Sequence, residues 1–135
     1  MSVDDLLLSE GRKLTLCATD DAHFYEPDHF GGWVMVKAEE NDETALVEAL
    51  KAGHYYSSQG PEIRRVEINE RSVVVECSAA VSVIIQGRGT GAKAVHGASM
   101  TRAEVPRDRL NDSPWLRVTV VDKAGKRAWS NPSWT

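Results

Sequence analysis

The pattern of apolar residues changes near residue 61, and this change limits the folds open to the chain. Before it, short apolar runs alternate with a helix-like segment; after it, runs such as "RRVEIN" alternate apolar and polar residues. A period of two is typical of strands with one buried face. The runs "SVVVECS", "VSVIIQG" and "WLRVTVVD" are short, close together and without helices between them. This spacing predicts an antiparallel, Ig-like β-sandwich over residues 62–135.

The part before residue 61 predicts a small α/β segment. "NDETALVEALKAG" is the clearest helix, because Asn41 or Asp42 can cap it and Gly53 can end it. "KLTLC" and "WVMVK" are expected as short strands, joined by the long loop "ATDDAHFYEPDHFGG". No low-complexity linker follows, so we expect residues 1–61 to pack against the mainly β domain of residues 62–135.

Charge and composition exclude several classes of function. The net charge of −4 provides no basic face for nucleic acid, and the adjacent Arg64 and Arg65 are expected on a solvated strand face. No apolar run approaches the ~20 residues of a membrane helix, and no basic region precedes the first leucines. We therefore expect a cytoplasmic protein with Cys17 and Cys77 as reduced thiols.

Three further motifs have ordinary structural interpretations. "GRGTG" would need a helix directly after it to form a phosphate loop, and none is expected, so it predicts a hairpin loop. Ser57 and Ser58 in "YYSSQGP" could be nucleophiles only beside a base, and their spacing favours a turn. His54 and His96 stand alone in the sequence and are expected at the surface.

The motif "TDDAH" is the candidate metal site. At the end of a strand, the backbone can turn so that Asp21 and His23 reach one ion. A carboxylate and a neutral imidazole suit Zn²⁺, Mn²⁺ or Fe²⁺. The spacing alone favours a solvated acidic loop over a metal site.

Four segments together resemble a known family. "TDDAHF", "GGWVMVKAEE", "ETALVEALKAGHYYSSQGPEI" and "RAWSNPSW", in this order, are similar to the C-terminal end of the polymerase and histidinol phosphatase (PHP) family of metal-dependent phosphoesterases. The similarity is to bacterial members with a trailing β-domain, and it extends over essentially the whole chain. It implies that residues 1–61 are the last strand–helix units of the family's barrel. It also implies that Asp21 and His23 are metal ligands, and that the complete enzyme acts on a phosphate ester.

The sequence also departs from the family's pattern. The family's barrel opens with a His-x-His motif, whereas this chain has four histidines and no His-x-His. A barrel of this kind takes ~250 residues, so the part before residue 61 supplies only its end. Two ligands on one loop leave most coordination positions to solvent. We therefore expect no catalytic site in the chain alone, and in this interpretation the chain itself can lack a metal.

Three functional hypotheses follow from these observations. The first is the C-terminal part of a PHP-type phosphoesterase, inactive alone. The second is a stand-alone β-sandwich binding module with a vestigial metal loop, in which Trp115, Trp129 and Trp134 are contact residues instead of core residues.

The third hypothesis is a small hydrolase that completes its metal site across a subunit interface. It would need further ligands from the same loop, namely Glu26, Asp28 and His29. Independently of function, the "LTLCA" strand would have an unpaired edge beside leucines, which is a template for pairing with another chain. We therefore expect either a homo-oligomer joined through residues 3–37 or docking of this segment onto the sandwich.

Overall fold

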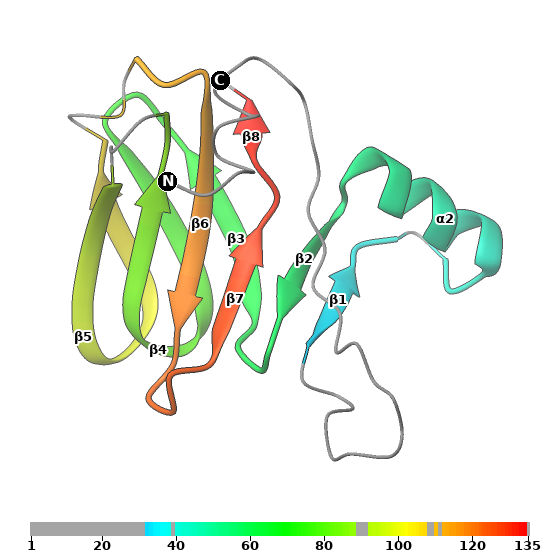
Figure 1. Cartoon of the computed structure of the whole chain (residues 1–135), viewed down its shortest axis with the longest axis horizontal. Helices are drawn as coiled ribbons and strands as arrows, with labels where there is room; N and C mark the ends of the chain where they lie inside the picture. Colours follow the sequence, from blue (N-terminus) through cyan, green and yellow to red (C-terminus); the bar gives the residue numbers. More distant parts are fainter. Residues whose placement is uncertain (1–31, 39, 89–91, 108–109, 111, 135) are drawn as a thin grey trace.

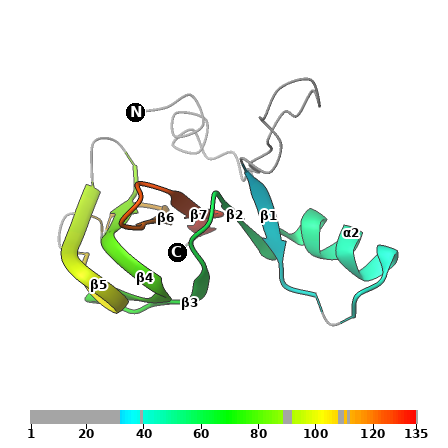
Figure 2. The same ribbon diagram turned by 90° about the horizontal axis from the view of Figure 1, so that it is seen from below.

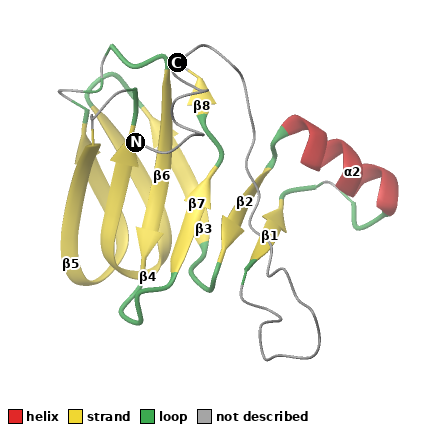
Figure 3. Cartoon of the chain, viewed as in Figure 1, coloured by secondary structure: helices red, strands yellow, loops and turns green. Residues whose placement is uncertain are grey.

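The structure is a computed structural model, and it describes residues 32–38, 40–88, 92–107, 110 and 112–134. Its one described helix lies beside a sheet, so the prediction of a mainly β chain with a small helical part is confirmed (Figures 1 and 3). The elements are β1 (Trp33–Val36), α2 (Glu43–Ala52), β2 (Tyr55–Ser58), β3 (Ile63–Ile68), β4 (Ser72–Gln86), β5 (Ala92–Pro106), β6 (Trp115–Val121), β7 (Arg127–Ser130) and β8 (Ser133–Trp134).

The eight strands form one curled antiparallel sheet. Its order is β1-β2-β7-β6-β4-β3, with β5 paired to β4 and β8 paired to β6. Figure 2 shows the strands curving round in the form of a half-barrel. Because β2 pairs with β7, strands from both sides of residue 61 belong to the same sheet.

Helix α2 forms where the sequence predicts it. The Asp42 carboxylate accepts a hydrogen bond from the Ala45 amide at 2.7 Å, and Gly53 ends the helix with a φ of 76°. β1 and β2 flank the helix and are antiparallel, with Trp33 opposite Ser58. α2 therefore does not make the crossover of a parallel strand–helix–strand unit. The strand expected at "KLTLC" lies outside the described residues.

The cap at Asp42 gives α2 a pH dependence. The hydrogen bond from the Ala45 amide, aided by Glu40, lowers the pKa of the Asp42 carboxyl below the ordinary value of 3.8. A lowered pKa in the folded state means that the cap stabilises α2 fully above pH 3.8 and is lost as the pH falls below that value. Asp42→Asn keeps the capping oxygen but removes the titration. We expect the Ala45 amide signal in an NMR titration to shift below pH 3.8 in the wild type only; an Asp42 pKa above the ordinary value would contradict this.

The hairpin of β4 and β5 bends the sheet. β4 is one strand of 15 residues, where the sequence suggests two strands, "SVVVECS" and "VSVIIQG". The register with β5 shifts between Glu76 and Ala80 and again between Ala80 and Ser82. On its other edge β4 pairs with β3 before these shifts and with β6 after them. Because bulges bend a strand and increase its twist, this midpoint is where the sheet changes direction.

The core lies against the inner faces of β4, β5 and β6. Val83, Ile85 and Val120 are fully buried, and Val118 is 3% exposed. Trp115 is also fully buried, which favours a packing role over a contact role for this side chain. Among the described residues, no helix has the length and apolar content needed to cross a membrane.

Only the end of the predicted association segment, residues 3–37, is described. Its residue Met35 on β1 is 42% exposed, and Val47 and Leu50 on α2 are also exposed. The "LTLCA" strand lies outside the described residues. Association through this segment therefore stays a prediction.

Candidate functional site

The predicted metal ligands Asp21 and His23 lie outside the described residues, as do Glu26, Asp28 and His29. Within the described part of the chain, no three His, Cys, Asp or Glu side chains are grouped so that they could hold a metal ion. The metal site therefore stays a prediction.

The glycine motif "GRGTG" leads into a strand and not into a helix. β4 ends at Gln86 and β5 begins at Ala92, so the order of elements that a phosphate loop needs does not occur here. Its first glycine has a packing role: a Cβ on Gly87 would lie 2.8 Å from Ser113 Oγ and 3.1 Å from Leu110 Cδ2.

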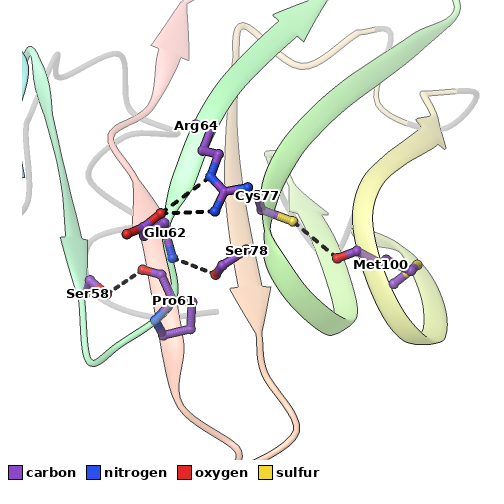
Figure 4. Close-up of polar contacts among 7 residues, drawn as sticks. All are labelled: Ser58, Pro61, Glu62, Arg64, Cys77, Ser78 and Met100. Atoms are coloured by element: carbon purple, nitrogen blue, oxygen red, sulfur yellow. Dashed lines mark hydrogen bonds and ion pairs between the residues drawn. The ribbon is translucent and has the colours of Figure 1, made fainter.

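Ser57 and Ser58 belong to the end of β2 and are buried, where the sequence favoured a turn. Ser58 Oγ donates to Pro61 O at 2.7 Å (Figure 4), and it accepts from the Gly60 amide at 2.9 Å. A hydroxyl that is buried and bonded in this way holds the turn into β3. It is not placed to act as a nucleophile.

The contacts of Cys77 and His96 also fit ordinary structural roles. Cys77 is a fully buried free thiol, with Sγ 3.8 Å from Met100 O. Burial raises the pKa of the Cys77 thiol, against a smaller opposite effect of Arg64, so the reactive thiolate is disfavoured. His96 is exposed on β5, and its Nδ1 lies 2.8 Å from Ser82 Oγ.

A groove of about 700 Å³ lies where the first strands of the sheet approach β3. It is large enough for a small organic molecule, since such sites usually measure about 300–1,000 Å³. Its lining comes from β1, the end of α2, β2, β3 and the C-terminal strands: Met35, Val36, Lys37, Gly53, His54, Tyr55, Tyr56, Ile63, Arg64, Arg65, Val66, Ser130 and Ser133.

The charged groups of this groove are all basic. Lys37, Arg64 and Arg65 line it, together with His54, and its described lining contains no aspartate or glutamate. The whole chain, in contrast, has a net charge of −4. The charged side chains of the described lining are therefore of one sign, on a protein that is acidic as a whole.

A β-bulge brings the two arginines to the same wall. Ile63 pairs with Cys77 and Arg65 pairs with Glu76, so Arg64 is an extra residue without an opposite partner in the ladder. In a regular strand, adjacent side chains point to opposite faces; a bulge changes the direction of a side chain. Arg64 and Arg65 can therefore both line the groove.

Each arginine has a carboxylate of its own strand region as a neighbour. Arg64 Nη2 lies 3.2 Å from Glu62 Oε2, and Arg65 Nη2 lies 3.2 Å from Glu67 Oε2 (the first pair is drawn in Figure 4). All four side chains are more than half exposed. Exposed pairs of this kind contribute only about 0–1 kcal/mol, so the guanidinium groups can exchange these partners for another anion.

The frame of the groove is fixed by backbone and side-chain hydrogen bonds. The Lys37 amide donates to His54 O at 2.8 Å, which joins the ends of β1 and β2. Asn131 Nδ2 donates to Gly53 O at 3.2 Å and to Tyr55 O at 3.1 Å. Together these bonds hold the start of β2 between β1 and the C-terminal segment.

Tyr56 connects β2 with β3 across the groove. Burial raises the pKa of its phenol, while a hydrogen bond with the backbone of Ile63 acts in the opposite direction. A phenol with a raised pKa is neutral at physiological pH. Tyr56 therefore adds a ring surface to the groove without adding negative charge.

The arginine pair is evident from the sequence, but the groove is not. Arg64 and Arg65 are exposed, as expected for a solvated strand face. One sequence signal could have indicated the groove, namely the two adjacent cations directly after "SSQGPEI". Two successive outward charges on a strand suggest a bulge.

Comparisons with known proteins provide no relative from which a function could be transferred. The chain matches no protein-family model, no curated protein and no solved structure.

Proposed function

We propose that the chain is the C-terminal part of a PHP-type metal-dependent phosphoesterase. In this proposal, residues 1–61 include the end of the barrel, although β1, α2 and β2 do not form a parallel strand–helix–strand unit. Residues 62–135 are an Ig-like trailing β-domain. Asp21 and His23 are two of the metal ligands, and the complete enzyme hydrolyses a phosphate ester. The chain alone is not a phosphoesterase, because the His-x-His motif of the family does not occur in it.

One observation carries this proposal. The segments "WVMV", "YYSS" and "RAWS", which belong to the resemblance, are the neighbouring strands β1, β2 and β7. Val34 lies opposite Ser57, and Ser57 lies opposite Trp129. None of the four quoted segments lies in the hairpin of β4 and β5, although this hairpin holds much of the core. A family signature that is scattered in sequence but contiguous in space supports a shared structural unit.

The donor set at this loop fits the proposed metal. The carboxylate of Asp21 and the imidazole of His23 are ligands that Zn²⁺, Mn²⁺ and Fe²⁺ accept. In a complete site, such ions lower the pKa of a bound water and neutralise phosphate charge. Asp21 would supply negative charge to the site, and His23 would supply a neutral nitrogen. Two donors do not fix a coordination geometry, so we expect weak metal binding by this chain alone.

The proposal predicts inactivity of the isolated chain and activity of a longer protein. The purified chain should not hydrolyse bis(p-nitrophenyl) phosphate with added Mn²⁺. The sequence encoded upstream should contain His-x-His, and the longer protein should hydrolyse a phosphate ester. In that protein Asp21→Asn and His23→Ala should each lower kcat/KM by about a hundredfold or more, because they remove direct ligands.

His96→Ala is the matched control, because His96 lies on exposed β5 outside the loop and its replacement should leave kcat/KM unchanged. An upstream sequence without His-x-His would contradict the proposal. Hydrolysis by the isolated chain that is lost in His23→Ala would also contradict it, and would support the hydrolase that completes its site between subunits.

The groove favours the second hypothesis, a binding module, independently of any metal. Its uniform charge and its size are features of a ligand site. Both functions are compatible in one chain, since the described lining of the groove comes from segments after the "TDDAH" motif.

A further inference from the structure

We propose that the groove between β1–β2 and β3 binds an organic phosphate, namely a phosphate dianion joined to a flat apolar group about the size of a mononucleotide. The inference rests on described residues of β1, β2 and β3. It does not require that Asp21 and His23 hold a metal, or that the chain belongs to a phosphoesterase.

The charge of the groove selects an anion. Lys37, Arg64 and Arg65 all line one space whose described lining has no acidic residue. A guanidinium group presents two parallel N–H donors that match two phosphate oxygens, and such charge-assisted bonds are stronger than neutral ones. Two guanidinium groups and one ammonium group can together balance the two negative charges of a phosphate monoester.

The bulge at Arg64 is the reason for choosing a ligand site over a solvated strand face. A solvated face accounts for the exposure of the two arginines, but in a regular strand they would point to opposite sides of the sheet. The register shift between Ile63 and Arg65 lets both line the same groove. Bulges are common next to binding and catalytic sites, where they change the direction of a side chain.

The glutamates beside the arginines do not prevent binding. Glu62 and Glu67 lie outside the described lining of the groove, and their pairs with Arg64 and Arg65 are exposed. Because exposed pairs are weak, a dianion held by both arginines at once replaces them at little cost.

The remaining lining suits the apolar part of the ligand. Tyr55 and Tyr56 contribute ring surfaces, and the aliphatic side chains come from both walls: Met35, Val36, Ile63 and Val66. Aromatic side chains and arginine planes both stack on flat rings. The raised pKa of the Tyr56 phenol keeps it uncharged, so it does not repel the phosphate.

Isothermal titration calorimetry with adenosine 5′-monophosphate as the probe tests the proposal. The titration uses the whole chain in EDTA, so that no metal-bridged phosphate contributes to the signal. We expect saturable binding, with adenosine alone and inorganic phosphate alone each at least about tenfold weaker. Affinity should fall with added salt, because the contacts are exposed to screening. The amide NMR shifts caused by the nucleotide should concentrate on the residues that line the groove.

Arg64→Gln and Arg65→Gln should each weaken binding about tenfold. Arg102→Gln is the matched control, since Arg102 is an exposed arginine of β5 that does not line the groove, and its affinity should equal that of the wild type. All three sites are exposed, and circular dichroism verifies that each variant is folded.

Three results would overturn the proposal. They are no saturable binding of the nucleotide up to about 10 mM, equal affinity for adenosine and its monophosphate, and equal affinity of wild type and Arg65→Gln. None of them bears on the phosphoesterase proposal, because the metal is absent from the titration and its test is hydrolysis by the longer protein.

Discussion

Replacing Ile85 by alanine should lower the free energy of unfolding by about 2–5 kcal/mol. Ile85 is fully buried in the middle of the sheet, where β4 places it between Val118 of β6 and Lys93 of β5. Its truncation removes apolar surface from the core and leaves a cavity, because Val118 cannot move inward without breaking its pairing. Urea unfolding followed by circular dichroism measures the change, and the midpoint should fall while the m-value stays constant.

Val47→Ala is the matched control for this core variant. Val47 is another β-branched apolar residue, but it is 43% exposed on α2. Its replacement should change the free energy of unfolding by no more than about 0.5 kcal/mol, because little apolar contact is lost and alanine favours a helix. If Ile85→Ala cost no more than Val47→Ala, the assignment of β4 to the centre of the core would be wrong.

The second large effect is expected for Gly87→Ala, at about 1–3 kcal/mol of lost stability. The added Cβ would lie 2.8 Å from Ser113 Oγ and 3.0 Å from Ser113 Cβ. Ser113 cannot easily move away, because its Oγ accepts from the Arg88 amide at 2.9 Å and donates to Trp115 O. Either the turn after β4 shifts or these hydrogen bonds break, and thermal unfolding should show a lower Tm.

Gly60→Ala separates this packing effect from the general effect of replacing a glycine. The nearest atom to a Cβ at Gly60 is Lys126 Cβ at 3.8 Å, which is an ordinary contact. Gly60 is also not among the described glycines with positive φ. Its replacement should be neutral or slightly stabilising, because alanine restricts the unfolded chain. A wild-type Tm for Gly87→Ala would show that the turn adjusts freely and that the close packing at Gly87 is unimportant.

The local elements of the fold could be predicted from the sequence. The cap at Asp42 and the stop at Gly53 define α2 without reference to the rest of the chain. The strand at "WVMVK" and the mainly β nature of the later part were likewise evident from apolar runs and their period.

The arrangement of the strands could not be predicted, because it depends on contacts between distant residues. The polar and small residues of "ECSAA" look like a break, but the bulges around Ala80 carry β4 through as one strand. The first half of β5, "AKAVHGAS", has only one apolar residue larger than alanine, Val95, and its pairing with β4 defines it as a strand. β2 was expected as a turn because its partner β7 is far away in sequence.

The two candidate sites differ in how far the sequence could predict them. Asp21 and His23 were identified by residue type and by a family resemblance, and they lie outside the described residues. The groove was missed because its charges, on Lys37, Arg64 and Arg65, come together only through the curl of the sheet and the bulge in β3. Neither the curl nor the bulge has a strong local signal in the sequence.

The pairing of β2 with β7 also determines the order in which the sheet assembles. Gln59 and Arg127, which are hydrogen-bonded at the end of this pairing, are 68 positions apart in the chain, whereas Ser82 and His96 in the β4–β5 hairpin are 14 apart. Closing a longer loop costs more chain entropy, and contacts between distant residues slow folding. The hairpin should therefore form early, while β1, α2 and β2 should dock late and detach first in partial unfolding. Since one wall of the groove belongs to the late-docking part and β3 forms the other, a molecule bound there would slow this detachment. A ligand bound in the groove should then slow hydrogen exchange at the Lys37 amide, which donates to His54 O between β1 and β2.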